Sequence, residues 1–211
     1  MIELNNIIHA DCMDIMRDIP DKYFELAIVD PPYGINAGKM TMGQGSGNDT
    51  GKHKVKSWDE KIPDKLYFNE LKRISKNQII WGGNYFIDYL NNTSCFLLWD
   101  KKDYNSDFAS HEMAWTSFNS QVKCFQRARS SNNDNKGKIH PTQKPVALYR
   151  WLLQKYAKPG DKIIDTHSGS GSCAIACHLE KFDFLAIEKD EDYYEASVKR
   201  LDEVRSQGVL F

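Results

Sequence analysis

The segment VDPPYGI (29–35) places one carboxylate, two prolines and an aromatic ring directly after an apolar stretch. That stretch, FELAIV (24–29), is apolar apart from Glu25 and predicts a buried strand. Proline lacks the N–H that a sheet ladder needs, so the strand must end at Asp30. Either the segment is a plain turn, or Asp30 and Tyr33 form a small polar clamp at the carboxyl edge of a sheet.

A second segment, DTHSGSGS (165–172), predicts a strand end, a glycine-rich turn and the start of a helix. Glycine tolerates positive φ angles and close approach of a ligand, and a helix N-terminus offers free N–H groups. Glu188 ends the next predicted strand, where a carboxylate can accept hydrogen bonds from ribose hydroxyls. Ala174 stands where a dinucleotide motif has its third glycine, and alanine is tolerated there. We expect a nucleoside-type cofactor, with a purely structural turn as the alternative.

The third segment is HPTQKP (140–145), directly before the amphipathic helix predicted at 146–157. Thr142 and Lys144 can donate a hydroxyl hydrogen bond and a charged hydrogen bond to a carboxylate. Taken alone, the segment is more simply explained as an ordinary helix start with proline in the first turn.

The rest of the chain predicts alternating strands and helices. Strands are expected at 6–10, 24–30, 77–83, 95–101 and 183–190, helices at 12–19, 64–74, 84–91, 146–157, 173–180 and 191–205, and two antiparallel edge strands at 111–118 and 121–128. This order predicts a Rossmann-like α/β fold with a mostly parallel, doubly wound sheet of about seven strands and an antiparallel edge. Ligands lie outside the carboxyl ends of such strands. Asp11, Asp30, residues 168–171 and Glu188 are therefore expected to face one crevice.

The composition is that of an ordinary globular protein with a single domain, 1–211, because 41% of the residues are hydrophobic and 27% are charged. No apolar run approaches the roughly 20 residues that span a bilayer. The first residues, MIELNNIIHADC, lack the features of a signal peptide. We expect a cytoplasmic protein with no membrane contact. Five scattered cysteines form no C-x-x-C pair and no cluster with histidine, which favours reduced thiols and no metal site.

The charge is uneven along the chain although the net charge is only −1. Residues 121–150 contain seven lysines and arginines and one acidic residue. Such a segment is either a solvated surface or a contact for a phosphate backbone. The glycine-, serine- and lysine-rich stretch 36–57 predicts a mobile loop.

Together and in this order, DPPYGI, HPTQKP and DTHSGSGSCAIAC resemble the DNA amino-methyltransferases that use S-adenosylmethionine. The catalytic motif comes first and the glycine motif last, which resembles the permuted β group of that family. The N-terminal HADCMDIMRDIPDKYFELAIVDPPY is also similar to its pattern. The resemblance covers the chain outside about 36–57 and 101–138, and it implies a circularly permuted methyltransferase fold.

The resemblance implies a role for each matching residue. S-adenosylmethionine would contact the backbone and side chains of Asp11, Cys12, Thr142, Lys144, Asp165, His167, Ser168, Gly169, Gly171 and Glu188. Of these, Glu188 would hold the ribose, Asp11 and Cys12 the adenine, and Thr142 and Lys144 the methionine carboxylate. The family usually has Pro-Phe where this chain has Thr166-His167. His167 would replace the phenylalanine as a flat ring against the cofactor.

The catalytic residues implied are Asp30, Pro31, Pro32 and Tyr33. An exocyclic amine on a nucleobase is a poor nucleophile because its lone pair is delocalised into the ring. The Asp30 carboxylate and the Pro31 carbonyl would accept hydrogen bonds from the two N–H groups, and the prolines would keep both acceptors fixed in advance. Tyr33 would stack on a base flipped out of the duplex. An aspartate at the first position of the motif favours adenine N6, with cytosine N4 as the alternative.

The implied partner is double-stranded DNA. Target recognition would belong to a small insertion at 101–139, with Lys123, Arg127 and Arg129 as contacts, while Lys52, Lys54 and Lys56 in the loop would close over the DNA. Both segments are short, so either the recognised site is short or a homodimer shares the work, as relatives of this group often do.

Three other functions fit parts of the sequence. An RNA or protein-amide methyltransferase also uses such a clamp, although the permuted order and HPTQKP count against it. A nucleic-acid-binding relative with a decayed cofactor site is supported by His167 alone. A nucleotide-dependent oxidoreductase leaves HPTQKP and DPPY unexplained.

Overall fold

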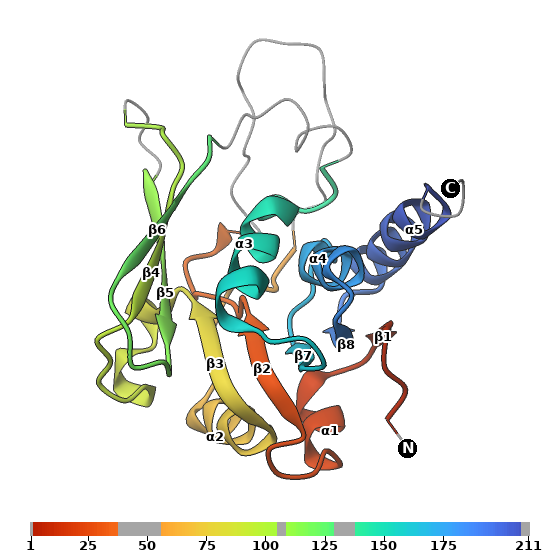
Figure 1. The fold of residues 1–211 in the computed structure, drawn as a ribbon, viewed down its shortest axis with the longest axis horizontal. Coiled ribbons are helices and arrows are strands. Elements are labelled where there is room, and N and C mark those ends of the chain that lie inside the picture. Colours follow the sequence, from red (N-terminus) through yellow and green to blue (C-terminus); the bar gives the residue numbers. More distant parts are fainter. Residues whose placement is uncertain (1, 38–55, 105–108, 129–137, 208–211) are drawn as a thin grey trace.

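The computed structural model describes residues 2–37, 56–104, 109–128 and 138–207. Within these ranges the chain forms one eight-stranded sheet in the order β1-β8-β7-β2-β3-β5-β4-β6 (Figure 1). The strands are β1 Asn6–His9, β2 Phe24–Val29, β3 Ser75–Trp81, β4 Phe96–Asp100, β5 His111–Thr116, β6 Lys123–Gln126, β7 Lys162–Asp165 and β8 Asp183–Glu188. The expected Rossmann-like, mostly parallel sheet is confirmed, with eight strands rather than about seven.

The reversed strand lies inside the sheet rather than at its edge. β5 is antiparallel to both of its neighbours, β3 and β4, whereas β6 is parallel to β4 and forms the edge. Of the two edge strands expected at 111–118 and 121–128, only β6 lies at the edge, because β4 lies between β5 and β6. Both β5 and β6, which lie within 101–139, are strands of the main sheet.

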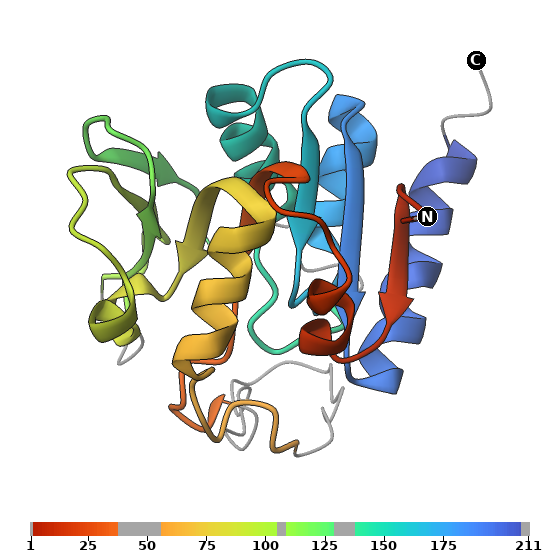
Figure 2. The same cartoon turned by 90° about the horizontal axis from the view of Figure 1, so that it is seen from below.

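Helices cover both faces of the sheet (Figure 2). They are α1 Cys12–Arg17, α2 Lys65–Ile74, α3 Val146–Tyr156, α4 Ser172–Glu180 and α5 Glu191–Gln207. Side chains alternate along each strand, so Leu26 and Ile28 of β2 pack in the core under α3 to α5, and Ala27 and Val29 pack in the core under α1 and α2. This explains why β2 is apolar on both faces, as expected for a buried parallel strand.

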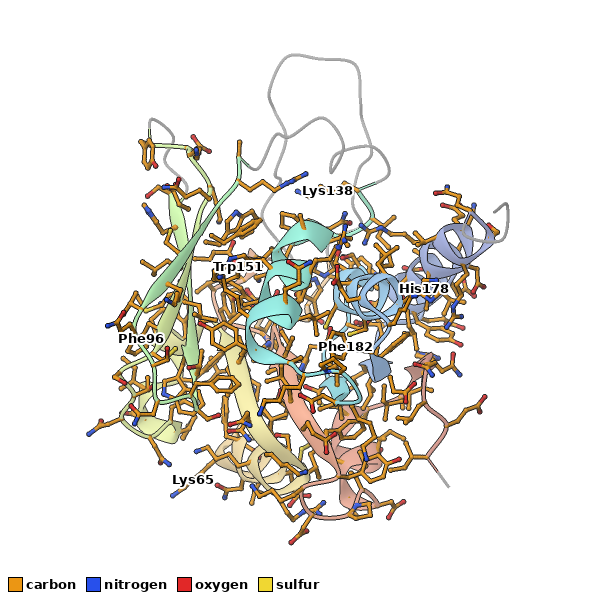
Figure 3. The ribbon with its side chains drawn as sticks, in the orientation of Figure 1. Lys65, Phe96, Lys138, Trp151, His178 and Phe182 are labelled. Carbon is orange, nitrogen blue, oxygen red and sulfur yellow. The ribbon has the colours of Figure 1, made fainter. Side chains whose placement is uncertain are left out.

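Large side chains pack between α3 and the sheet, among them Trp151 (Figure 3). Trp151 of α3 packs against Phe125 of β6, with ring centroids 5.6 Å apart. The buried side chains of α3 and α4 belong to the same apolar core.

Among the described helices, none is both long and apolar enough to cross a membrane.

The helix expected at 84–91 is replaced by two short 3-10 helices, Gly83–Tyr85 (η2) and Ile87–Tyr89 (η3). The chain leaves β3 through Gly82, whose φ of 70° is left-handed. A Cβ atom on Gly82 would lie 2.1 Å from the Tyr33 ring. Gly82 therefore allows the backbone to lie directly against the tyrosine of the DPPY segment, and Gly83 allows it to lie against Trp115.

Parallel pairing fixes where the polar strand ends lie. β1, β8, β7 and β2 are adjacent and parallel, so their carboxyl ends meet at one edge of the sheet. Asp11, Glu188, Asp165 and Asp30 all lie at or directly beyond these ends. The crevice expected from the sequence therefore has its structural basis in four neighbouring strands.

Replacing Gly82 with alanine tests the contact with Tyr33. Gly160 is the matched control, because its φ is also positive, at 89°, while a Cβ there would meet nothing within 4 Å. Gly160→Ala should cost only the left-handed backbone penalty of about 1–2 kcal/mol. Gly82→Ala should cost clearly more, since the Tyr33 ring must also move. Urea unfolding measures both variants, and equal losses would contradict the proposed steric role of Gly82.

Candidate active site

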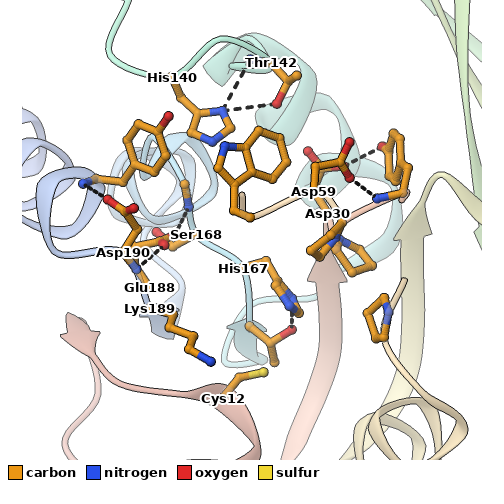
Figure 4. Close-up of a pocket in the computed structure, with 18 of the residues that line it drawn as sticks. Cys12, Asp30, Asp59, His140, Thr142, His167, Ser168, Glu188, Lys189 and Asp190 are labelled. Atoms are coloured by element: carbon orange, nitrogen blue, oxygen red, sulfur yellow. Dashed lines mark hydrogen bonds between the residues drawn. The ribbon is translucent and has the colours of Figure 1, made fainter. Parts of the chain in front are cut away.

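A cavity of about 1170 Å³ opens at the carboxyl ends of β1, β2, β7 and β8 (Figure 4). Most residues expected to bind a cofactor or substrate line it, namely Asp11, Cys12, Asp30, Pro31, Pro32, Tyr33, Lys56, Thr142, Lys144, His167, Ser168, Gly169 and Glu188. Asp165 and Gly171 lie behind the wall. Gly171 is left-handed at the start of α4, where its missing Cβ leaves room for Ser197 and Ile7.

The glycine turn and the end of β8 are joined by the Glu188 carboxylate. Its Oε2 accepts from the Gly169 N–H at 2.6 Å, and its Oε1 accepts from the Asp190 N–H at 2.8 Å. Burial raises the pKa of Glu188 above its usual value, although both N–H groups oppose this. The Ser168 hydroxyl beside it is buried and has no hydrogen-bond partner among the described residues. The turn thus offers the cavity an unsatisfied hydroxyl and an acceptor already held in place.

Beside the end of β8 lies Asp11, which follows the neighbouring strand β1 and caps α1 by accepting from the Met13 N–H at 2.9 Å. The Lys189 ammonium lies 2.8 Å from the other Asp11 oxygen and is the main reason why the pKa of Asp11 is lowered. Burial raises the pKa of the adjacent Cys12 thiol to about 12, so this thiol is not a nucleophile at neutral pH. Asp11 and Cys12 are positioned to offer a carboxylate and backbone groups.

His167 presents a neutral ring to the cavity. Burial lowers its pKa to about 4. Its Nδ1 lies 3.0 Å from the Thr166 hydroxyl, and the ring packs edge-on against Tyr67 with centroids 5.2 Å apart. The Thr166 and Tyr67 hydroxyls are themselves hydrogen-bonded at 2.7 Å. The departure from Pro-Phe is therefore accommodated by a packed, uncharged aromatic group.

Asp165 lies below this ring and accepts from the His167 N–H at 3.1 Å. Burial raises the pKa of Asp165 to about 8, with smaller contributions from the nearby carboxylates of Asp30 and Glu188. At neutral pH the folded protein therefore holds Asp165 mainly in its protonated form.

The DPPY segment forms a closed polar cluster in the cavity wall. Asp30 Oδ1 accepts from the Tyr33 hydroxyl at 2.5 Å, and Asp30 Oδ2 accepts from the Lys144 ammonium. Lys144 also donates to the Tyr33 hydroxyl at 3.2 Å, and its side chain is only 2% exposed. Burial is the main reason why the pKa of Asp30 is raised. We call Asp30, Pro31, Pro32 and Tyr33 the amine clamp.

The structure brings Lys144 to the amine clamp rather than leaving it free for a ligand carboxylate. Thr142, its partner in that expectation, has its hydroxyl 3.1 Å from His140 Nδ1. His140 in turn packs between the rings of Trp58 and Tyr193, with centroids 4.9 and 4.3 Å away. A carboxylate bound at this end of the cavity would have to compete with these contacts.

Asp59 is a site residue that the sequence analysis missed. Its Oδ1 accepts from the N–H groups of Tyr33 at 2.6 Å and Gly34 at 3.0 Å, and its Oδ2 accepts from the Ala37 N–H at 2.8 Å. Asp59 is only 2% exposed, so it fixes the backbone that follows the prolines. No sequence pattern links it to the clamp, because the two segments are separated by the stretch expected to be a loop.

Tyr85 was also missed. Its ring stacks on Tyr33 with centroids 5.0 Å apart and an interplanar angle of 15°, and it is 43% exposed. One face of the Tyr33 ring is thus already covered by Tyr85, a partly exposed residue of η2.

The residues expected to contact DNA are only partly described. Lys123 lies on edge strand β6 and Arg127 directly after it. Lys56 pairs with Asp190 and, at 2.8 Å, with Asp192, and it lies 4.2 Å from the Tyr193 ring centroid. Lys52, Lys54 and Arg129 lie outside the described residues, as does most of the expected loop 36–57.

Within the described ranges, no three His, Cys, Asp or Glu side chains are grouped so as to hold a metal ion. All five cysteines are free thiols.

The fold is that of a methyltransferase, and the family comparison agrees. The model of the DNA methylase family of N6 and N4 methyltransferases matches residues 61–199. The chain belongs to this family, and it is a DNA methyltransferase. The family assignment made from the three motifs is therefore confirmed.

Relatives with assigned activities span nearly the whole chain. The type II methyltransferase M.HinfI of Haemophilus influenzae is 27% identical over 96% of this chain and 69% of its own length. The type II methyltransferase M2.MboI of Moraxella bovis is 23% identical over 94% of this chain and 88% of its own.

Solved structures share the fold at lower identity. The M1.HpyAVI complex with S-adenosylmethionine has a TM-score of 0.62 at 17% identity and covers 93% of this chain and 98% of that one. The cytosine-N4-specific PvuII DNA methyltransferase has a TM-score of 0.62 at 12% identity, covering 96% and 91%. The first of these supports the expected cofactor. Together the matches leave the choice between adenine and cytosine open.

Asp59→Ala tests the backbone support of the clamp. Each of the three N–H groups would lose its acceptor, at about 1–3 kcal/mol for each group that stays buried. We expect DNA methylation to fall more than tenfold while the folded core persists, with turnover measured under saturating cofactor. Asp161→Ala is the control, because Asp161 also accepts a backbone N–H, from Lys158 at 2.8 Å, in a turn remote from the cavity. Equal activity in both variants would refute the role of Asp59.

Asp165→Asn tests the protonated carboxyl group. A pKa of about 8 in the folded protein and about 3.9 in the unfolded chain means that the folded state binds more protons between these values. Wild-type stability therefore loses this contribution as the pH rises from about 4 to 8. The asparagine variant should gain unfolding free energy relative to wild type over that window, as measured by urea unfolding at several pH values. A difference that does not vary with pH would contradict the raised pKa.

Proposed function

We propose that the protein transfers a methyl group from S-adenosylmethionine to the exocyclic amine of an adenine flipped out of DNA. The observation that carries the proposal is the position of the amine clamp. Asp30 and Tyr33 lie in the wall of the same cavity that Asp11, Ser168 and Glu188 line. A methyl donor and an amine acceptor bound there would be neighbours.

The residues present fit the cofactor. Glu188, held by two N–H groups, can accept from ribose hydroxyls, and the buried Ser168 hydroxyl lacks a partner among the described residues. Gly169 leaves space in front of the His140 ring, since a Cβ there would be 3.7 Å from it. When bound, S-adenosylmethionine supplies an electrophilic methyl group on a sulfonium. Asp11 and Cys12 would recognise its adenine, and Asp165, His167 and Gly171 would shape the methionine end.

The clamp would orient the amine. One N–H of the base would donate to Asp30 and the other to the Pro31 carbonyl, which directs the nitrogen lone pair toward the methyl group. The Asp59 hydrogen bonds and the two prolines hold this geometry before substrate arrives, so little reorganisation is needed in the transition state. In the free protein both Asp30 oxygens are hydrogen-bonded, and the amine would replace one of these partners.

The extra proton on the methylated nitrogen would leave through Asp30. The raised pKa of this carboxyl group makes it a better proton acceptor than an exposed aspartate. Tyr33 would stack on the flipped base, and Tyr85 would have to move aside or share the stack, since it covers Tyr33 in the free protein.

Contacts to double-stranded DNA would come from both sides of the cavity. Region 101–139 would carry target recognition, with Lys123, Arg127 and Arg129 meeting phosphates or bases, and Lys52 and Lys54 would act from the loop. Lys56 would join them only by leaving its pairs with Asp190 and Asp192. A homodimer would enlarge this small recognition surface.

Adenine is favoured by the aspartate at the first position of the clamp motif. Cytosine N4 is the second candidate, because PvuII methyltransferase shares the fold and is specific for that amine. Both bases present an amine with two N–H donors, so the clamp chemistry is the same for either.

The deciding experiment is transfer of radiolabel from S-adenosylmethionine to unmethylated genomic DNA, followed by nucleoside analysis. We expect labelled N6-methyladenine. Asp30→Ala should reduce labelling at least about 100-fold, because it removes the acceptor that orients the amine. Glu25→Gln is the control, since Glu25 pairs with Lys76 far from the cavity.

Other outcomes are informative. Labelled N4-methylcytosine would keep the clamp mechanism and change the base. Label in RNA or protein but not in DNA would contradict the DNA substrate, and failure to bind S-adenosylmethionine would indicate a decayed site. Full activity of Asp30→Ala would refute the clamp itself.

A further inference from the structure

Lys144 is shared between two carboxylates, and only one of them belongs to the amine clamp. Its ammonium donates to Asp30 on one side and lies 3.0 Å from Glu112 Oε2 on the other. Glu112 Oε1 lies 2.6 Å from the Lys101 ammonium. Four charged side chains therefore alternate in sign along a row, in the order Asp30, Lys144, Glu112 and Lys101.

We propose that Glu112 is a positioning residue, which acts through Lys144 to keep the Asp30 carboxylate available to a substrate amine. This inference rests on the proposed function, because it concerns how the clamp accepts its substrate.

The reversed direction of β5 explains how Glu112 reaches the site. In the antiparallel register Trp81 pairs with Ala114 and Trp99 with Glu112, so the first residues of β5 extend past the end of β3. A parallel strand in this place would bring its last residues to this edge. Glu112 thus lies at the same edge as the clamp although its strand runs the other way.

The two contacts of Lys144 differ in kind. The ammonium forms hydrogen bonds with Asp30 and with the Tyr33 hydroxyl. The contact with Glu112 Oε2 is an ion pair of 3.0 Å, in which the coulombic interaction is the larger contribution. Glu112 therefore acts on Lys144 mainly by charge.

The charges that surround Glu112 and Asp30 determine the direction in which the pKa of each carboxyl group is shifted. Burial alone would raise the pKa of Glu112, but the Lys144 and Lys101 ammonium groups outweigh it and lower the pKa to about 2. Glu112 is therefore a permanent negative charge at working pH. It opposes the effect of Lys144 on Asp30 and contributes, after burial, to the raised pKa of Asp30.

Without this second carboxylate, Lys144 would neutralise Asp30 alone. Asp30 would then be a weaker base and would hold its lysine more firmly, so a substrate amine would displace Lys144 less easily. The other titratable side chains whose charges interact with Asp30 are Tyr33, Tyr67, Tyr149 and Asp165. At neutral pH the tyrosines and Asp165 are mainly protonated, so Glu112 is the main source of negative charge facing the Asp30–Lys144 pair.

Glu112→Gln keeps the size of the side chain and removes its charge. The pKa of Asp30, followed by carbon NMR of aspartate-labelled protein and assigned with Asp30→Asn, should be lower in this variant than in wild type. The acidic limb of the methylation rate should move to lower pH by the same amount. Turnover at neutral pH should fall about tenfold, while KM for S-adenosylmethionine changes little.

Three variants separate charge from packing. Lys101→Met removes the other partner of Glu112 and should move the pKa of Asp30 in the opposite direction, upward. Glu112→Asp keeps the charge and should keep an acidic limb close to that of wild type. Glu25→Gln removes a paired carboxylate elsewhere in the sheet and should change neither the pKa of Asp30 nor the acidic limb of the methylation rate. If Glu112→Gln does not fold, Lys101→Met tests the proposal instead: an upward shift of the Asp30 pKa would support it, and no shift or a downward shift would overturn it.

An unchanged pKa of Asp30 in Glu112→Gln would overturn the proposal, whatever the activity. A lowered pKa with an unmoved acidic limb would also overturn it, because Glu112 would then not act on the rate through Asp30. A lowered pKa in a protein whose wild type methylates no DNA would support the charge coupling and contradict the proposed function, so the two failures are distinguishable.

Discussion

Parallel pairing of β1, β8, β7 and β2 is the constraint on which the site depends. Because all four strands point the same way, each delivers its last polar residue to the same edge of the sheet. Helices on both faces hold these strands in two apolar cores, so the edge is rigid although the residues beyond it are polar. The direction of the strands determines where the cavity lies, and the identity of the side chains determines its chemistry.

Several carboxyl groups lie close together around the cavity, and each has a different partner or protonation state. Asp11 is paired with Lys189, Glu188 is held by backbone N–H groups, and Asp165 is protonated. Asp30 shares a lysine with Glu112. Mutual repulsion is thereby limited without a metal ion having to be invoked, and each group retains a distinct capacity to donate or accept.

Local patterns carried most of what could be predicted from sequence. The helix expected at 146–157 is Val146–Tyr156, and the strand expected at 24–30 is Phe24–Val29, because periodicity and proline act over a few residues. Asp59 and Glu112 escaped prediction, since each meets the clamp only after the sheet has formed. The direction of β5 likewise depends on pairing with distant strands, and the segment expected as a helix at 84–91 forms two 3-10 helices after the left-handed Gly82.

The pairing of β1 with β8 joins the first strand of the chain to the last. During synthesis on the ribosome, Asp11 and the clamp emerge well before the glycine turn and Glu188. A nascent chain therefore presents Asp11 and the clamp before the glycine turn and Glu188 can pack beside them. The cavity is therefore complete only after β8 has been synthesised and has paired with β1, which delays the first possible turnover.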